Sequence, residues 1–183
     1  MSQGKAFPLE IAKLHAGIYL AAVLPYCERG LIVGSVRRSK PEVNDIEILI
    51  IPKTTPEKDM FETVIGEISA FELAFSALVK SWNADVVMDG PKSKRLIAPD
   101  GIPLEIYVSD PARWGVETVI KTGSSDFSKR CVTIKQAGGY LPSNCVVKNG
   151  WQVYRGQTVL PMPTEESFLD FLGLGWIDPE KRK

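Results

Sequence analysis

One strand-like segment constrains the fold of this 183-residue chain more than any other. Residues 46–51 read Ile-Glu-Ile-Leu-Ile-Ile, and such β-branched runs favour a buried strand. Asp45 precedes the run and Glu47 lies within it. Side chains two residues apart on a strand share a face, so the two carboxylates lie side by side while the isoleucines at even positions face a core. The fold therefore has to hold two neighbouring carboxylates on an otherwise apolar strand.

The rest of the chain predicts an α+β fold, in which a mixed sheet with helices is followed by a smaller lobe. Asp110-Pro111 marks the boundary between them, because Pro111 is well placed to open a helix. We therefore expect one domain over residues 1–110 and a second over residues 111–183.

The expected elements follow from apolar periodicity and from turn residues. Helices are expected over 9–28, 56–80 and 125–136 and from Thr164 to about Leu172. Strands are expected at 31–33, 46–51, 84–88, 94–98 and 102–108, and then around 145–148, 151–154 and 157–160. Residues 34–44 are expected to form a polar turn region, Asn149-Gly150 a tight turn, and 178–183 a frayed tail.

Composition excludes several classes of protein. Hydrophobic residues make up 44% of the chain and charged residues 24%, which is typical of a folded domain and not of a disordered chain. No apolar run is long enough to cross a membrane and the N-terminus lacks the pattern of a signal peptide, so we expect no membrane partner. Three cysteines without CxxC spacing argue against a disulfide framework or a zinc site and indicate a reducing compartment such as the cytoplasm.

Charge is balanced overall but unevenly distributed. The formal net charge of zero gives no sign of a nucleic-acid binder. Residues 1–110 hold 12 basic and 15 acidic residues, whereas residues 111–183 hold 10 and 7. This distribution suits a metal-binding half followed by a polyanion-binding half, although it also arises by chance.

The paired acids point to a hard divalent cation. Two carboxylates held side by side repel each other unless cations neutralise them, and oxygen ligands of this kind suit Mg²⁺. A third acid, Glu105, lies in the strand expected at 102–108 and faces away from that strand's apolar side chains. If the two strands are neighbours, Asp45, Glu47 and Glu105 converge and can hold two metal ions, as in phosphoryl transfer.

The preceding segment is suited to phosphate. A Gly34-Ser35 turn after a buried strand exposes backbone N–H groups and a hydroxyl, which can hold phosphate oxygens. Arg37, Arg38 and Lys40 follow at once and can neutralise a triphosphate. The acids would bind the metal ions, and the metal ions would bind phosphate oxygens. The turn would bind the remaining phosphate charge.

These motifs together resemble a known family. Residues 34–47 resemble the Gly-Ser…Asp-x-Asp/Glu signature of the nucleotidyltransferase superfamily and, more specifically, that of family X DNA polymerases, the polymerase beta type. Residues 121–127, Lys-Thr-Gly-Ser-Ser-Asp-Phe, look like the family's Phe-Thr-Gly-Ser segment, and residues 171–182 resemble its closing Leu-Gly-Leu…Pro-Pro-Glu-x-Arg motif. The matches run in family order from about Phe7 to the last residues.

The resemblance implies a nucleotidyltransferase palm followed by a small α+β C-terminal subdomain. It implies a monomeric DNA-directed DNA polymerase that uses two Mg²⁺ ions, or Mn²⁺ in their place. Such an enzyme adds nucleotides from a (deoxy)nucleoside triphosphate to a primer 3′-hydroxyl, and gapped DNA in repair is the expected substrate. The length suits the reduced forms of viruses and mobile elements, so a bacterial or phage-encoded cytoplasmic protein is expected.

The resemblance also assigns roles to individual residues. Asp45, Glu47 and Glu105 take the places of the metal-binding catalytic acids, and Glu105 that of the acid expected to activate the primer hydroxyl. The nucleotide-binding places fall on Gly34, Ser35, Arg38, Asn44, Thr122, Gly123, Ser124 and Asp126, with Ser125 as an alternative to Asp126 beside the base. Contact with DNA phosphates is expected of Lys121, Lys129 and Arg130, whose other interpretation is a charged helix face.

Departures from the family pattern leave two alternatives open. Glutamates stand where aspartates are usual at 47 and 105, Ile120-Lys121 replaces an aromatic pair, and Val132 stands where many relatives have a template-contacting Arg. One alternative is transfer to another acceptor, such as RNA, a protein or a small molecule, or extension of single strands without a template. The other is a nucleotide- or DNA-binding module whose catalysis has degraded.

Overall fold

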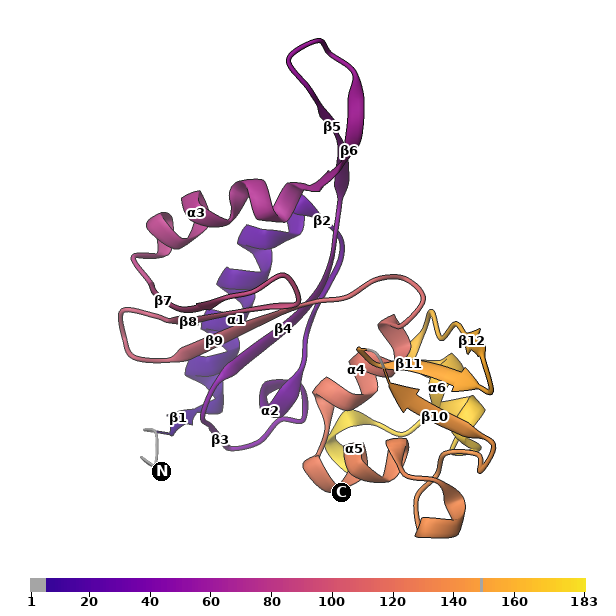
Figure 1. Ribbon diagram of the computed structural model, residues 1–183. Helices are drawn as coiled ribbons and strands as arrows, with labels where there is room; N and C mark the ends of the chain where they lie inside the picture. Colours follow the sequence, from indigo (N-terminus) through magenta and orange to yellow (C-terminus); the bar gives the residue numbers. More distant parts are fainter. Residues whose placement is uncertain (1–5, 149) are drawn as a thin grey trace.

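The structure is a computed structural model that describes residues 6–148 and 150–183. Asn149, expected in a tight turn, lies outside the described residues. The fold is α+β, with a larger N-terminal part and a smaller C-terminal part joined by the segment that follows strand β9 (Figure 1). Within the described residues, no helix combines the length and apolar character needed to cross a membrane.

A five-stranded mixed sheet organises the larger part. Its strand order is β2-β4-β9-β8-β7, and only the central pair β4–β9 runs parallel. The bounds are β2 Cys27–Ile32, β4 Ile46–Pro52, β7 Asp85–Asp89, β8 Ser93–Ile97 and β9 Pro103–Val108. A parallel neighbour requires a long crossover, which here contains β7 and β8.

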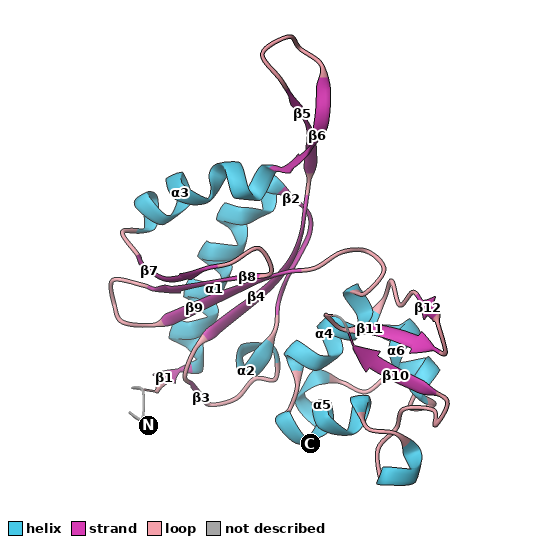
Figure 2. Cartoon of the chain, viewed as in Figure 1, coloured by secondary structure: helices cyan, strands magenta, loops and turns pink. Residues whose placement is uncertain are grey.

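Both faces of β4 are buried, which explains its run of β-branched residues. Ile46, Ile48 and Ile50 pack against helices α1, Leu9–Val23, and α3, Ala70–Trp82, which cover one face of the sheet (Figure 2). On the other face, Leu49 and Ile51 pack against Trp114 of the C-terminal part. Only the N-terminal end of that second face, at Glu47, is left for polar chemistry.

The C-terminal part has its own apolar core. It consists of an antiparallel sheet and three helices that share this core. The strands are β10 Cys145–Lys148, β11 Gln152–Arg155 and β12 Thr158–Leu160, and the helices are α4 Trp114–Thr122, α5 Ser125–Val132 and α6 Glu165–Leu172. Thr164 caps α6, because its side chain accepts a hydrogen bond from the Ser167 backbone N–H at 3.1 Å. In return, the Ser167 hydroxyl accepts one from the Thr164 backbone N–H at 3.2 Å. The expected helix after Thr164 is confirmed.

The helix expected over 56–80 is wrong in its first half. Residues 54–69 form an antiparallel hairpin, β5 Thr54–Lys58 and β6 Val64–Ser69, which projects from the body (Figure 1). Asp59 forms the turn by accepting from the backbone N–H groups of Phe61 and Thr63 at 2.8 and 2.9 Å. Helix α3 begins only at Ala70, after Ser69 as N-cap.

Other boundaries also differ from expectation. Helix α1 ends at Val23, and the chain makes a 3₁₀ turn over Leu24–Tyr26, since Pro25 cannot continue the hydrogen-bond ladder. The polar turn region contains a short helix, α2, at Gly34–Arg37, and β3 at Glu42–Val43, which pairs with β1 at Phe7–Pro8. Helix α5 ends at Val132, and Lys135–Ala137 forms a separate 3₁₀ turn. The tail is not frayed: Pro179–Lys181 is a 3₁₀ turn and Arg182 is buried.

Candidate functional site

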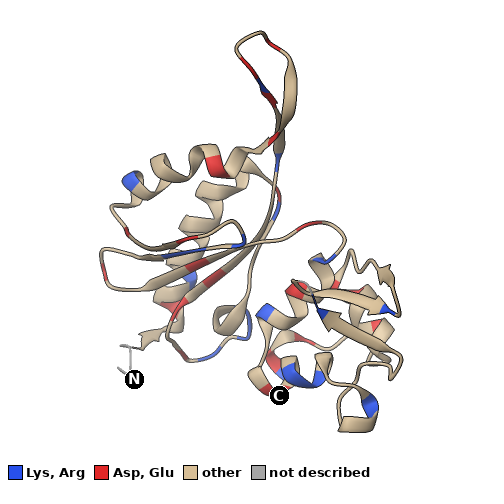
Figure 3. Ribbon diagram, viewed as in Figure 1, with Lys and Arg blue, Asp and Glu red and all other residues tan. Residues whose placement is uncertain are grey.

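Strand pairing brings the three sequence-predicted acids to one face of the sheet. Strands β4 and β9 are parallel neighbours, and Glu47 is the register partner of Glu105. Asp45 directly precedes β4 and lies within electrostatic range of Glu105 and Glu47. The prediction that the two strands are neighbours is confirmed, and Figure 3 shows acidic residues side by side on these strands.

Burial of these carboxyl groups and their closeness to one another both disfavour their charged forms. Burial raises the pKa of Glu47 from 4.5 to about 7, and the charge of Asp45 acts in the same direction. The pKa of Asp45 is also raised, first by burial and then by the charge of Glu105. A cation bound among these carboxylates would favour their charged forms and so oppose both pKa shifts.

Two side chains that sequence reasoning missed hold the acids. The hydroxyl of Tyr107 donates to Oε1 of Glu47 at 3.0 Å, and the guanidinium of Arg95 donates to Oε2 of Glu105 at 2.9 Å. Tyr107 lies two residues after Glu105 on the same face of β9, and Arg95 is the register partner of Glu105 on β8. The period of two residues along β9 indicates the first contact in the sequence, but the second depends on knowing the β8–β9 register.

The donor types of the cluster fit a hard divalent ion. Three carboxylates beside one another supply the oxygen ligands that Mg²⁺ and Mn²⁺ prefer. In their present positions, however, no group of three or more Asp, Glu, His or Cys side chains in the described ranges is arranged for metal binding.

The Gly34-Ser35 turn lies directly against Glu47. Gly34 has a φ of +66°, and a Cβ at this position would overlap Oε2 of Glu47. Only glycine therefore allows both the backbone conformation and the approach of the carboxylate. In the described part of the chain, the buried hydroxyl of Ser35 and the buried Nε of Arg38 find no hydrogen-bond partner. Buried polar atoms without partners are rare, and here both residues also line one small cavity.

That cavity has a volume of about 270 Å³, and we call it the phosphate cavity after the ligand that we propose for it below. Its wall combines Ser35 with the cations Arg38 and Lys40 and with the acids Asp45 and Glu47. Its lining residues are Ser35, Arg38, Lys40, Glu42, Asn44, Asp45 and Glu47. Of the predicted nucleotide-binding residues, the structure places Ser35, Arg38 and Asn44 here.

The two adjacent arginines have different partners. Arg38 donates to the backbone carbonyl of Thr122, and burial lowers its pKa while Glu47 and Asp45 oppose that change. Arg37 donates to both carboxylate oxygens of Glu165, at 2.9 and 2.6 Å, and to Oγ1 of Thr122 at 2.8 Å. The expectation that Arg37 neutralises a triphosphate is therefore corrected, since its guanidinium is already engaged away from the phosphate cavity.

A second cavity of about 350 Å³ adjoins the first and shares Arg38 and Glu47 with it. We call it the nucleoside cavity after the ligand that we propose for it below. Helices α4 and α5 form its other wall, with Trp151 from the turn before β11. Its lining residues are Arg38, Glu47, Ile120, Lys121, Gly123, Ser125, Ser128, Lys129, Val132 and Trp151. Gly123, Lys121 and Lys129 are sequence-predicted residues that the structure brings to this cavity.

The remaining predicted residues lie outside both cavities. Thr122 is fully buried with its hydroxyl bonded to Arg37, and Ser124 caps helix α5 by accepting from the Phe127 N–H at 3.3 Å. Asp126 is exposed, with its carboxylate 3.9 Å from the ammonium of Lys129, and Arg130 lies over the ring of Tyr140. Ser125, the alternative to Asp126, is the member of that pair that lines the nucleoside cavity.

Trp151 is a cavity residue that sequence reasoning placed in a core or cap role. It has a φ of +70°, which is unusual for a bulky side chain, and it lines the nucleoside cavity. No signal in the sequence marks it, because its position depends on the docking of the β10–β11 turn against α4.

Comparison of the chain with protein-family models and with curated proteins found no match. The function has to be argued from the site itself.

Proposed function

We propose that this protein is a nucleotidyltransferase of the family X polymerase type, with residues 1–110 as its palm. It transfers a nucleotide from a nucleoside triphosphate to an acceptor hydroxyl, and DNA is the favoured acceptor. The observation that carries the proposal is the Glu47–Glu105 register pair beside the Gly34-Ser35 turn, where a buried Ser35 hydroxyl has no partner in the described chain. Neither a carboxylate pair nor a glycine turn alone supports this function, but here the turn lies in contact with one of the paired carboxylates.

Two adjoining cavities divide the donor nucleotide between them. In the phosphate cavity, the Ser35 hydroxyl and the cations Arg38 and Lys40 are placed to bind the outer phosphates. The sugar and base extend into the nucleoside cavity, whose walls carry Gly123 and Ser125. Arg38 lines both cavities, so it stands where the two parts of the nucleotide join.

Asp45, Glu47 and Glu105 would hold the metal ions. When bound, Mg²⁺ or Mn²⁺ supplies charge neutralisation at the phosphates and lowers the pKa of a coordinated hydroxyl. Glu105 is placed to accept the proton of the acceptor hydroxyl. Arg38 stabilises the charge that develops on the departing pyrophosphate, so that catalysis rests on positioning and electrostatics.

Primer extension on gapped DNA tests the proposal. Wild-type protein with Mg²⁺ or Mn²⁺ is expected to incorporate nucleotides, whereas Asp45→Asn is expected to remain folded and lose incorporation. Glu42→Gln is the matched control, because Glu42 lines the phosphate cavity but is not one of the three acids. Full activity in a folded Asp45→Asn variant, or none in the wild type above that of a triple acid-to-amide variant, would overturn the proposal.

One observation favours a second acceptor mode. Val132 lines the nucleoside cavity at the position where the resembled family often has a template-contacting arginine. An apolar side chain there offers no hydrogen bond to a template base, which favours template-independent addition or another acceptor. Extension on four homopolymer templates separates the two modes, since incorporation that ignores the template identifies the second.

A further inference from the structure

The β5–β6 hairpin carries exposed apolar side chains at its tip. Met60 and Phe61, in the turn between the strands, are 88% and 78% exposed. Val64 and Ile65, at the start of β6, are also exposed. The hairpin projects from the body of the molecule, so no described residue covers this end (Figure 1). A two-stranded hairpin alone is at best marginally stable in water, and an exposed apolar patch of this kind is typical of a contact surface.

The hairpin also carries the negative charge of the larger part of the chain. Residues 54–69 hold four acids and one base, and residues 1–110 hold 15 acids and 12 bases, so 11 of each lie outside the hairpin. The one base, Lys58, pairs with Glu62 at 2.6 Å. The acids left in excess are Glu57, Asp59 and Glu67. This charge disfavours nucleic acids and anionic membranes as partners of the hairpin and favours a basic protein surface.

The β10–β12 sheet offers a second exposed apolar surface. One set of alternating side chains packs into the core of the C-terminal part. The other set places Val146, Tyr154 and Val159 in one row across the three strands, because Tyr154 is the register partner of both valines. Val146 is 45% exposed and Val159 is 39% exposed. We call the surface formed by this row and Lys148 the outer sheet face.

The charge around the outer sheet face is positive. Residues 145–160 include the bases Lys148 and Arg155 and no acid. The ammonium of Lys148 lies 4.9 Å from the ring centroid of Tyr154, at the end of the apolar row. In the ranges that the structure describes, neither base forms an ion pair. Their charges are therefore available to a partner.

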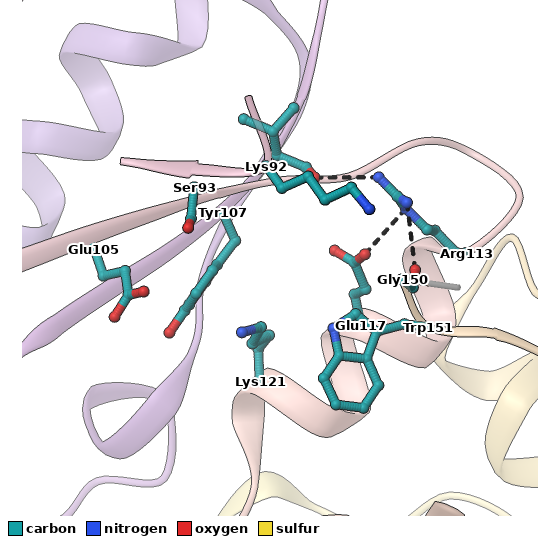
Figure 4. Close-up of a pocket in the computed structure, with 10 residues that line it drawn as sticks. Lys92, Ser93, Glu105, Tyr107, Arg113, Glu117, Lys121, Gly150 and Trp151 are labelled. Carbon is teal, nitrogen blue, oxygen red and sulfur yellow. Dashed lines mark hydrogen bonds and ion pairs between the residues drawn. The ribbon is translucent and has the colours of Figure 1, made fainter. Parts of the chain in front are cut away.

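Other cations of the C-terminal part are engaged within the molecule. Arg113 pairs with Glu117 at 3.0 Å. Lys121 lies within electrostatic range of the carboxylates of Glu105 and Glu117, and all four of these residues line a third cavity of about 180 Å³ (Figure 4). Tyr107 and Trp151 line the same cavity. The outer sheet face differs from this region because its bases have no acids beside them in the sequence of the sheet.

We propose that the hairpin tip of one copy of this chain docks on the outer sheet face of a second copy. The apolar tip meets the apolar row, and the excess acids of the hairpin face Lys148 and Arg155. In one molecule the two surfaces lie on different sides of the body, so their contact joins two copies (Figure 1). Each copy offers one surface of each kind, so the copies associate head to tail.

The dimensions of the two surfaces suit this contact. The five residues of β5 extend about 17 Å, whereas three neighbouring strands span about 10 Å, so the hairpin is long enough to cross the outer sheet face. The inference does not depend on the proposed nucleotidyl transfer. It differs from the monomer that the family resemblance implies.

Sedimentation velocity of the full-length protein over a range of concentrations tests the contact. The sedimentation coefficient of the wild type is expected to rise with concentration, and added salt is expected to weaken the association. Phe61→Ser is expected to raise the dissociation constant about tenfold. Leu73→Ser is the matched control, because it removes an exposed apolar side chain of α3, outside both surfaces, and it is expected to associate like the wild type.

A second variant tests the other side of the contact. Val146→Glu places a negative charge on the outer sheet face and is expected to weaken the association as Phe61→Ser does. Its matched control is Val86→Glu, the same change at a valine of β7 that is 48% exposed. If Val146→Glu does not fold, Lys148→Glu tests the same face with a change at an exposed side chain.

Mixing the two variants gives the sharpest test. Phe61→Ser keeps an intact outer sheet face and Val146→Glu keeps an intact hairpin tip, so an equimolar mixture is expected to form a heterodimer at a concentration where each variant alone is monomeric. A mixture that stays monomeric overturns the inference, as does a wild type that stays monomeric up to about 100 μM. Equal weakening by Phe61→Ser and Leu73→Ser shows a nonspecific apolar association and also overturns it. A monomeric wild type whose affinity for a single-stranded oligonucleotide falls in Lys148→Glu assigns the outer sheet face to nucleic acid instead.

Discussion

Arg37 and Glu165 form a bidentate ion pair between residues 128 positions apart, with N–O distances of 2.9 and 2.6 Å. Arg182, whose side chain is fully buried, donates to the same carboxylate at 2.6 Å. The pair connects the helix of the Gly34-Ser35 turn to helix α6 and to the C-terminal segment. The Gly34-Ser35 turn is therefore held in place by residues from the far end of the chain.

Glu165→Gln is expected to destabilise the protein by about 3 to 5 kcal/mol, because it leaves two largely buried guanidinium groups without a counter-charge. Chemical denaturation measures the change. Glu166→Gln, at the exposed neighbouring position, is expected to stay within about 0.5 kcal/mol of wild type. Equal stabilities of the two variants would show that the ion pair does not join the two parts of the chain.

Gly34→Ala is expected to abolish nucleotide binding, since the added methyl group overlaps the Glu47 carboxylate. Gly101→Ala is the matched control: its φ of +86° imposes a similar backbone penalty of about 1 kcal/mol, but nothing lies within 4 Å of the new Cβ. Triphosphate binding by isothermal calorimetry distinguishes them. Normal binding by Gly34→Ala would contradict the close contact between the turn and Glu47.

Stability without divalent metal is expected to fall as pH rises from about 4.5 to 7. The pKa of Glu47 is raised from 4.5 to about 7 in the folded state, so the folded state binds more protons in this window and loses that advantage as pH rises. The buried Glu117, whose pKa is raised to about 7 mainly by burial, acts in the same direction.

Unfolding free energies measured between pH 5 and 8 in a chelator test this dependence, with a limiting slope of about 1.4 kcal/mol per pH unit for each such proton. Glu47→Gln removes one contribution and Glu117→Gln the other, so each single variant is expected to flatten the profile. If stability depended on pH in Glu47→Gln as it does in the wild type, the Glu47 carboxylate would not be buried beside Asp45.

Tyr107→Phe is expected to raise the Mg²⁺ concentration needed for half-maximal activity while leaving the fold intact. Its hydroxyl bond to Glu47 opposes the rise in that carboxylate's pKa, so its loss makes the charged, metal-binding form less accessible. Metal titration of primer extension measures the shift. Lys80→Gln, an exposed change on α3, serves as the control, and an unshifted titration in Tyr107→Phe would remove Tyr107 from the site.

The local sequence pattern correctly predicted those elements whose residues favour a single type of secondary structure. The β-branched run from Ile46, the helix after Thr164 and the strands near 145–160 all form close to where their sequences predict. The helix expected at 56–80 failed because apolar spacing over residues 54–69 also fits a hairpin, and its turn at Asp59 went unrecognised.

The sequence by itself determined which groups could do chemistry: acids at 45, 47 and 105, a Gly-Ser turn and the cations beside it. Only the tertiary structure decided that Glu47 and Glu105 are register partners, that Arg38 and not Arg37 lines the phosphate cavity, and that Tyr107 and Trp151 belong to the cavities. The physical reason is the separation along the chain over which each kind of interaction acts. Strand and helix preferences act between near neighbours in the chain, whereas these contacts join residues up to 128 positions apart and exist only once two cores have packed together.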